Sequence, residues 1–198
     1  MYVTDFHTTE KRSAKAEGGV ERRMTEAAVM IAVAMHFMAE QRRLGEIGAV
    51  SMHPDGEHAK QFNIIDCLSG HGFSRLNGIG STLYGGLYGR GEDRVVVNPK
   101  SGLGDVSAVV GGQLMIAECK GGVINSKHGG VLSKTRSGLS ELVGQLMVLE
   151  DNGARQLAVR PFTVQALTLA ERLAPRCRKA GIEIALVEPD GRLVFVGA

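Results

Sequence analysis

The spacing of hydrophobic positions divides the chain into helical and strand-like segments. Residues 20–44 repeat apolar side chains at helical spacing and add a second apolar stripe, which predicts a long helix buried on more than one side. Short apolar runs predict strands at residues 94–98, 105–110 and 113–120. The same patterns then predict a helix at 137–151, a strand at 155–160, a helix at 163–179, and strands at 182–187 and 193–196. This order of helices and strands favours an α/β domain.

Three segments lack such periodicity. Residues 1–19 are polar and predict a loose N-terminal arm ahead of a single domain at residues 20–198. Residues 78–91 and 121–135 are rich in glycine, and both are predicted as long loops. The first of these loops is also a candidate mobile flap.

A Gly-Gly pair between two of the predicted strands indicates a tight hairpin. With Gly111 and Gly112 as the turn residues, Asp105 falls opposite Glu118. Opposed side chains share one face of a sheet, with Cβ atoms about 5 Å apart. Strand alternation places Lys120 on the same face as Glu118. Two carboxylates and an ammonium are therefore expected to converge at one end of the hairpin.

Apolar side chains occupy both faces of this hairpin. Leu114 and Ile116 lie on one face, whereas Met115 and Ala117 lie on the other together with Cys119. A strand that is apolar on both faces is central and covered on both sides. The hairpin therefore predicts a three-layer α/β/α sandwich around a central mixed β-sheet.

Composition indicates the cellular environment of the protein more than its function. Of 198 residues, 43% are hydrophobic and 22% charged, which is ordinary for a globular protein, and the net charge of +2 does not by itself indicate a nucleic-acid partner. The three cysteines are too widely spaced for a disulfide framework or a zinc knuckle, so a reducing cytoplasm is expected. The polar start predicts no secretory signal. The most apolar helical stretch, residues 27–39, is too short to span a bilayer, and no membrane partner is expected.

Gly104-Asp105, followed after twelve residues by Glu118-Cys119-Lys120, resembles the PD-(D/E)xK nuclease superfamily. The family core is a helix, three strands, a helix and a strand, with the Asp and the E-x-K on adjacent strands, and residues 20–160 would be covered. The resemblance implies a restriction-endonuclease-like fold. One departure is that Gly104 stands where the family often has proline.

The resemblance also implies the roles of the site residues. Asp105 and Glu118 would bind Mg²⁺ or Mn²⁺, helped by the backbone carbonyl of Cys119, because hard oxygen ligands suit these ions. Lys120 would orient the attacking water and stabilise developing charge. Beside two carboxylates its ammonium should remain protonated until substrate and metal arrive. The alternative interpretation of the same residues is a structural salt bridge at a strand end.

Weaker candidates surround this motif. Residues 120–136 contain no acid, and their cations are candidates for contacting nucleic-acid phosphates, namely Lys127, His128, Lys134 and Arg136. Gln145 resembles a glutamine that some branches of the superfamily place after the E-x-K strand. Glu26 is a candidate for an extra acid near the metal, with Glu57 as a rival. Ordinary surface, capping or core-edge roles stay open for all of these residues.

The leading hypothesis is a metal-dependent endonuclease that hydrolyses phosphodiester bonds of nucleic acid, with DNA as the expected substrate. A single centre per chain makes double-strand cutting easiest to explain by a homodimer. One alternative is a non-catalytic nucleic-acid-binding or assembly protein with the same fold. Another is a sugar or nucleotide enzyme, which would have a deep apolar pocket rather than an open basic cleft.

Overall fold

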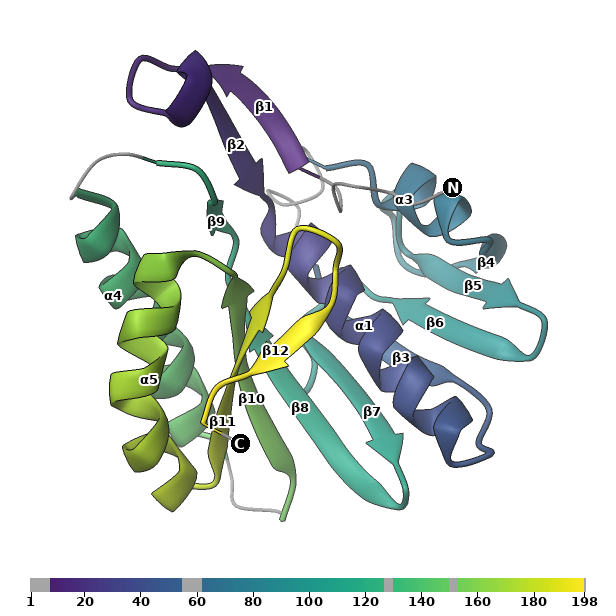
Figure 1. Cartoon of the computed structure of the whole chain (residues 1–198). Coiled ribbons are helices and arrows are strands. Elements are labelled where there is room, and N and C mark those ends of the chain that lie inside the picture. The colour runs from purple at the N-terminus through teal and green to yellow at the C-terminus, as the bar shows by residue number, and fades with distance from the viewer. Residues whose placement is uncertain (1–7, 55–61, 127–129, 150–152, 198) are drawn as a thin grey trace.

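The computed structural model describes residues 8–54, 62–126, 130–149 and 153–197, whose arrangement is shown in Figure 1. The helices of this part of the chain are α1 (Glu26–Arg43), α3 (Ile64–Gly70), α4 (Gly130–Met147) and α5 (Val164–Lys179), with a 3-10 turn at Glu17–Gly19. The strands of the main sheet are β3 (Ala49–Met52), β4 (Ser74–Gly78), β5 (Gly86–Arg90), β6 (Asp93–Val97), β7 (Val106–Val110), β8 (Gln113–Cys119), β10 (Arg155–Pro161), β11 (Ile182–Val187) and β12 (Leu193–Phe195).

The nine strands of the main sheet lie in the order β12-β11-β10-β8-β7-β3-β6-β5-β4. Strand β10 runs parallel to both β8 and β11, and β3 runs parallel to β6, whereas the remaining neighbours are antiparallel. The sheet is therefore mixed, as the hairpin pattern predicts. A separate small sheet joins β1 (Thr8–Arg12), β2 (Val20–Met24) and β9 (Gly122–Val123) in the order β1-β2-β9.

The register of the β7–β8 hairpin is the one predicted from the Gly-Gly pair. Val110 pairs with Gln113, and Val106 pairs with Ala117. Gly111 and Gly112 form the turn with φ of 59° and 78°, the positive values that a two-residue hairpin turn of this kind requires. Continuing this register by one residue brings Asp105 opposite Glu118.

Helices cover both faces of the central strands. Met115 and Ala117 of β8 belong to a buried core shared with α1 and α3, whereas Ile116 belongs to a second core shared with α4 and α5. This alternation confirms the α/β class and explains why both faces of the hairpin are apolar. In α1, the five consecutive residues 29–33 are all buried. Because five residues of an α-helix span more than a full turn, α1 is buried on several sides.

Helix α1 starts six residues later than predicted. The helix is capped at Thr25, whose side chain accepts a hydrogen bond from the Ala28 N–H. The five residues before the cap form β2 instead, pairing with β1 from Thr8 opposite Met24 to Arg12 opposite Val20. The predicted loose arm thus contains β1, one strand of a hairpin. The other strand, β2, lies in the segment predicted as the start of the helix.

The glycine-rich stretch predicted as a loop or flap at residues 78–91 is a loop at residues 79–85, but residues 86–90 form strand β5. Strand β5 pairs with both β4 and β6, and Tyr88 of β5 lies opposite Val95. Tyr88 is only 1% exposed, so a large buried side chain anchors the strand despite its glycines. Helix α4 likewise begins at Gly130, seven residues earlier than predicted. Among the described residues, no helix has both the length and the apolar character needed to cross a membrane.

Candidate metal centre

The carboxylate of Asp105 is held at the open end of the β7–β8 hairpin. Its Oδ2 accepts a hydrogen bond of 2.7 Å from the Cys119 N–H. The backbone of Asp105 is also fixed, because its N–H donates to the Ala117 carbonyl at 3.0 Å and its carbonyl accepts from the His53 N–H at 2.8 Å. The side chains of Asp105 and Glu118 share a hydrogen bond. The predicted facing pair is thus brought together.

Gly104 positions Asp105 through a backbone conformation that proline cannot adopt. Its φ is 69°, whereas proline is restricted to about −65°. A Cβ at this position would lie 2.6 Å from Ile116 Cγ2 and 3.0 Å from the Ala117 carbonyl oxygen. The departure from the family pattern therefore has a local physical reason.

We expect Gly104→Ala to destabilise the protein by about 1–3 kcal/mol, because alanine adds both backbone strain and a steric clash. Gly112→Ala is the matched control, since Gly112 also has positive φ (78°) but nothing within 4 Å of an added Cβ. Urea unfolding of the two variants separates the clash from the strain. Equal losses in both variants would contradict a specific close contact at Gly104.

Lys120 lies between two acids from different helices. Its Nζ is 2.9 Å from Glu141 Oε1 on α4 and 3.8 Å from Glu26 Oε2 at the start of α1. Glu26 is the more enclosed acid, with 12% of its side chain exposed against 46% for Glu141. The next residue, Gly121, explains how α1 approaches so closely, because a Cβ there would lie 2.6 Å from the Glu26 nitrogen.

A hydrogen bond from Arg160 holds α4 beside Lys120. It lies near the end of β10, directly after Val159, whose carbonyl accepts the Lys120 N–H at 2.9 Å. The Arg160 side chain is buried, and its Nη1 donates to the Thr135 carbonyl on α4 at 2.6 Å. Burial lowers the pKa of Arg160. This contact sets the position of α4 and hence of Glu141.

The neighbouring acids raise the pKa values of Glu118 and Lys120. Burial, followed by the neighbouring Asp105, raises the pKa of Glu118 to about 7, with Glu26 adding to the effect and Lys120 opposing it. The hydrogen bond that Lys120 donates to the Glu141 carboxylate raises the pKa of Lys120, which keeps the ammonium protonated. Burial raises the pKa of the Cys119 thiol well above its usual value. The thiol belongs to the core with α1, so only the backbone of Cys119 is left as a candidate ligand.

The donor set fits a hard divalent cation held by two carboxylates. Within the described residues, no group of three or more His, Cys, Asp or Glu side chains has the arrangement of a metal site. The structure brings together a pair of carboxylates, Asp105 and Glu118. Lys120 lies between this pair and Glu141. Magnesium is often held by only one or two carboxylates with water filling the remaining positions. A pair of carboxylates with an excess of negative charge is therefore compatible with Mg²⁺ or Mn²⁺.

In the metal-free protein, we expect thermal stability to fall as the pH rises from about 5 to 8 in a way that depends on Glu118. The folded pKa of Glu118 is about 7 and lies above the ordinary value of 4.5, so its contribution is complete below pH 4.5 and is lost as the pH passes 7. Each kcal/mol lost lowers the melting temperature by about 2–4 °C in a chain of this size. Glu118→Gln should lack this part of the decline, measured by thermal unfolding in chelator.

The matched control is Glu92→Gln, which changes an exposed acid at the β5–β6 turn. At pH 8, added Mg²⁺ or Mn²⁺ should raise the melting temperature of the wild type and of the control, but not that of Glu118→Gln. Parallel pH profiles for the wild type and Glu118→Gln would contradict the buried acid pair.

Of the other predicted residues, only Arg136 and Gln145 have described side chains, and neither has a described contact with Asp105, Glu118 or Lys120. Arg136 is exposed on α4, and Gln145 is exposed one turn beyond Glu141. Lys134 is part of α4, but its side chain is not among those described, and Lys127, His128 and Glu57 lie outside the described residues. Sequence reasoning missed Glu141 and Arg160. No local pattern in the sequence marks either residue, because their contacts with Lys120 and Thr135 join segments that are distant in the chain.

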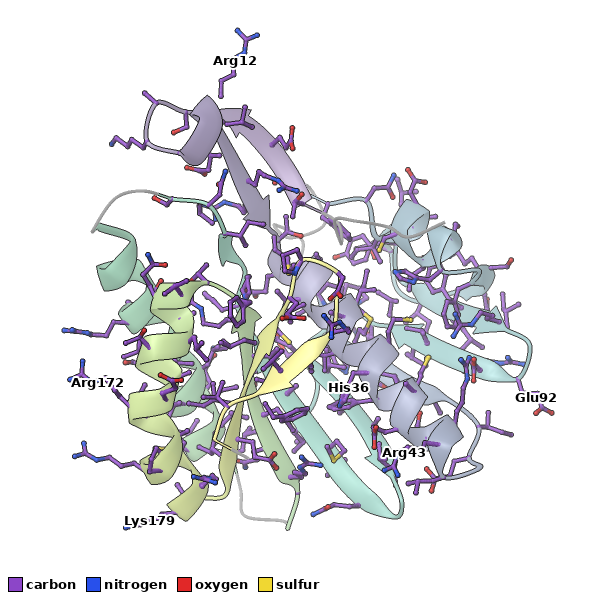
Figure 2. The ribbon with its side chains drawn as sticks, viewed as in Figure 1. Arg12, His36, Arg43, Glu92, Arg172 and Lys179 are labelled. Atoms are coloured by element: carbon purple, nitrogen blue, oxygen red, sulfur yellow. The ribbon has the colours of Figure 1, made fainter. Side chains whose placement is uncertain are left out.

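The first residues after Lys120 are held against the β1–β2 hairpin. Strand β9 pairs with β2, and the Asn125 side chain accepts from the Arg22 N–H at 2.8 Å and donates to the Val20 carbonyl at 2.6 Å. Figure 1 shows this hairpin projecting beyond the main sheet beside β9. Arg12 extends from the projecting hairpin into solvent, away from the rest of the molecule (Figure 2). The hairpin therefore borders the end of the sheet where Lys120 lies.

In comparisons with known proteins, no family model, curated protein or solved structure matches this chain.

Proposed function

We propose that this protein is a metal-dependent nuclease that hydrolyses phosphodiester bonds of nucleic acid, with DNA as the expected substrate. The observation that carries the proposal is the Asp105–Glu118 pair beside the ammonium of Lys120. A purely structural salt bridge would need one acid for one cation. Here three acids of the site raise the pKa of Lys120, and Asp105 and Glu26 both raise that of Glu118. A further cation would offset this excess of negative charge.

The order of elements supports a restriction-endonuclease-like core. Helix α1 comes first, Asp105 then directly precedes β7, the E-x-K residues lie at the end of the adjacent strand β8 with Lys120 just after it, and α4 leads to β10, parallel to β8. Strand β3 is the other neighbour of β7 and supplies the remaining core strand. In this interpretation, α3 and strands β4 to β6 are an insertion that widens the sheet.

Each residue of the centre then has a role. Asp105 and Glu118, with the Cys119 carbonyl, would hold the cation, which when bound polarises the phosphate and activates water. The protonated Lys120 donates hydrogen bonds to the phosphoryl oxygens and offsets their growing negative charge. Glu26 and Glu141 hold the lysine in place before substrate arrives. Because Glu141 is half exposed, an incoming phosphate can compete with it for the ammonium.

Incubation with labelled nucleic acids tests the proposal directly. Single-stranded, duplex and branched DNA, and the corresponding RNA, are incubated with Mg²⁺ or Mn²⁺ and, in parallel, with chelator. We expect cleavage of at least one DNA substrate that the chelator abolishes. Absence of cleavage on every substrate would contradict the nuclease, and tight binding without cleavage would favour the non-catalytic alternative. A homodimer is expected only if duplexes are cut on both strands.

A further inference from the structure

A groove lined by three arginines runs between helices α4 and α5. Arg136 and Ser140 of α4 face Arg172 and Arg176 of α5, with Leu169 and Leu173 completing the lining. Its volume is about 470 Å³. All three arginines are exposed, and Arg172 points outward from α5 in Figure 2. We call this feature the arginine groove.

The charges of the arginine groove are not balanced within the described part of the chain. Arg42, Arg155 and Arg192 each form an ion pair with a carboxylate elsewhere in the fold. None of the three groove arginines does so with any described residue. Arg172 and Arg176 are also one helical turn apart, where like charges repel. This arrangement is unfavourable for the isolated protein and becomes favourable when an anion enters.

The lining indicates which kind of anion fits. Guanidinium groups bind phosphate oxygens in a forked, two-bond geometry, which three of them can offer along a strand. Leucine side chains between the arginines provide apolar surface that suits a sugar face better than a small hydrated ion. A polymer with regular phosphates and sugars satisfies both features.

We propose that the arginine groove binds the phosphodiester backbone of the nucleic acid at a point away from the cleaved bond, an inference that rests on the proposed function. Helix α4 connects the two places. Glu141, which holds Lys120, lies five residues after Arg136, or about 7.5 Å further along the helix axis. Five residues also turn the helix by about 140°, so Arg136 and Glu141 project from different sides of α4, and a strand that leaves the metal centre would pass around α4 to enter the groove.

The test uses the full chain with Arg172 and Arg176 both changed to glutamine. The matched control, Arg178→Gln with Lys179→Gln, removes the same charge from the same helix outside the groove. Fluorescence anisotropy with a labelled 30-base DNA strand and its duplex, in chelator over a series of salt concentrations, measures binding without cleavage. We expect the groove variant to bind about tenfold more weakly, with the salt slope reduced by about 2, and the control to change less than twofold.

Arg136→Gln gives an independent check from the other helix, with a smaller loss in the same direction. Cleavage by the groove variant should show a raised KM with kcat nearly unchanged, because the groove does not touch the reacting bond. Equal losses in the groove variant and the control would overturn the arginine groove and leave the nuclease standing. Selective loss of binding in a protein that cuts nothing would overturn the nuclease and leave the groove standing. A wild type that binds neither probe would overturn both.

Discussion

Asp105→Asn is expected to reduce metal-dependent cleavage by about 10²–10³-fold, the effect typical of removing one preorganised electrostatic group from an active site. Asparagine has nearly the shape of aspartate, and its side-chain oxygen can still accept the Cys119 N–H that Asp105 Oδ2 accepts at 2.7 Å. The substitution therefore removes the charge and one cation ligand while keeping the local hydrogen bond. Initial rates at saturating metal and substrate measure the loss.

The Asp105→Asn variant has a second readout that does not depend on cleavage. Because Asp105 is the neighbouring charge that most raises the pKa of Glu118, that pKa should fall from about 7 toward its ordinary value. The pH dependence of thermal stability in chelator should weaken accordingly. Glu92→Gln, distant in Figure 2 at the tip of the β5–β6 turn, is the control and should cut like the wild type. An Asp105→Asn enzyme within threefold of the wild type would contradict the assignment of this carboxylate.

Lys120→Gln is expected to lower kcat by about 10²–10³-fold with a smaller change in KM. In the proposed mechanism, the substitution removes the cation that offsets the negative charge growing on the phosphoryl group. The substitution also removes the ammonium that lies 3.8 Å from Glu26 Oε2, in a site where only 12% of the Glu26 side chain is exposed. With the opposing lysine gone, the pKa of Glu118 should rise further.

Glu141→Gln tests the placement of Lys120 separately from its charge. It replaces the charged acceptor of the hydrogen bond that most raises the pKa of Lys120 with a neutral amide oxygen, but keeps the ammonium itself. We expect its loss of kcat to be within about tenfold, clearly less than that of Lys120→Gln. Lys179→Gln, a cation at the far end of α5 in Figure 2, controls for the general loss of positive charge. Wild-type kcat in Lys120→Gln would contradict the electrostatic role.

The facing acids were predictable because they depend only on local rules. A two-residue turn at Gly111-Gly112 sets the register, and the period of two along a strand sets the faces. The same rules separated Ile116 from Met115 and Ala117, which the structure assigns to two different cores. The sequence named Glu26 as a candidate but could not place it beside Lys120, because the contact joins two residues that are far apart in the chain.

The starts of helices and the glycine-rich segments were predicted less well. Met24 fits the apolar stripe of α1 equally well in sequence, yet Thr25 caps the helix and Met24 pairs with Thr8 in a strand. Tyr88 makes part of a glycine-rich segment a strand of the sheet by filling the core beneath it. In both places a tertiary contact outweighs the local preference.

By itself, the sequence determined the α/β class, the hairpin register and the meeting of Asp105 with Glu118 beside Lys120, since these follow from turn geometry and strand periodicity. Only the tertiary structure decided which helices reach that centre. Glu141 meets Lys120 because the buried Arg160 ties α4 to the end of β10. The arginine groove exists because α4 and α5 pack side by side on one face of the sheet. Contacts between distant segments depend on how whole elements pack, which no local spacing of residues specifies.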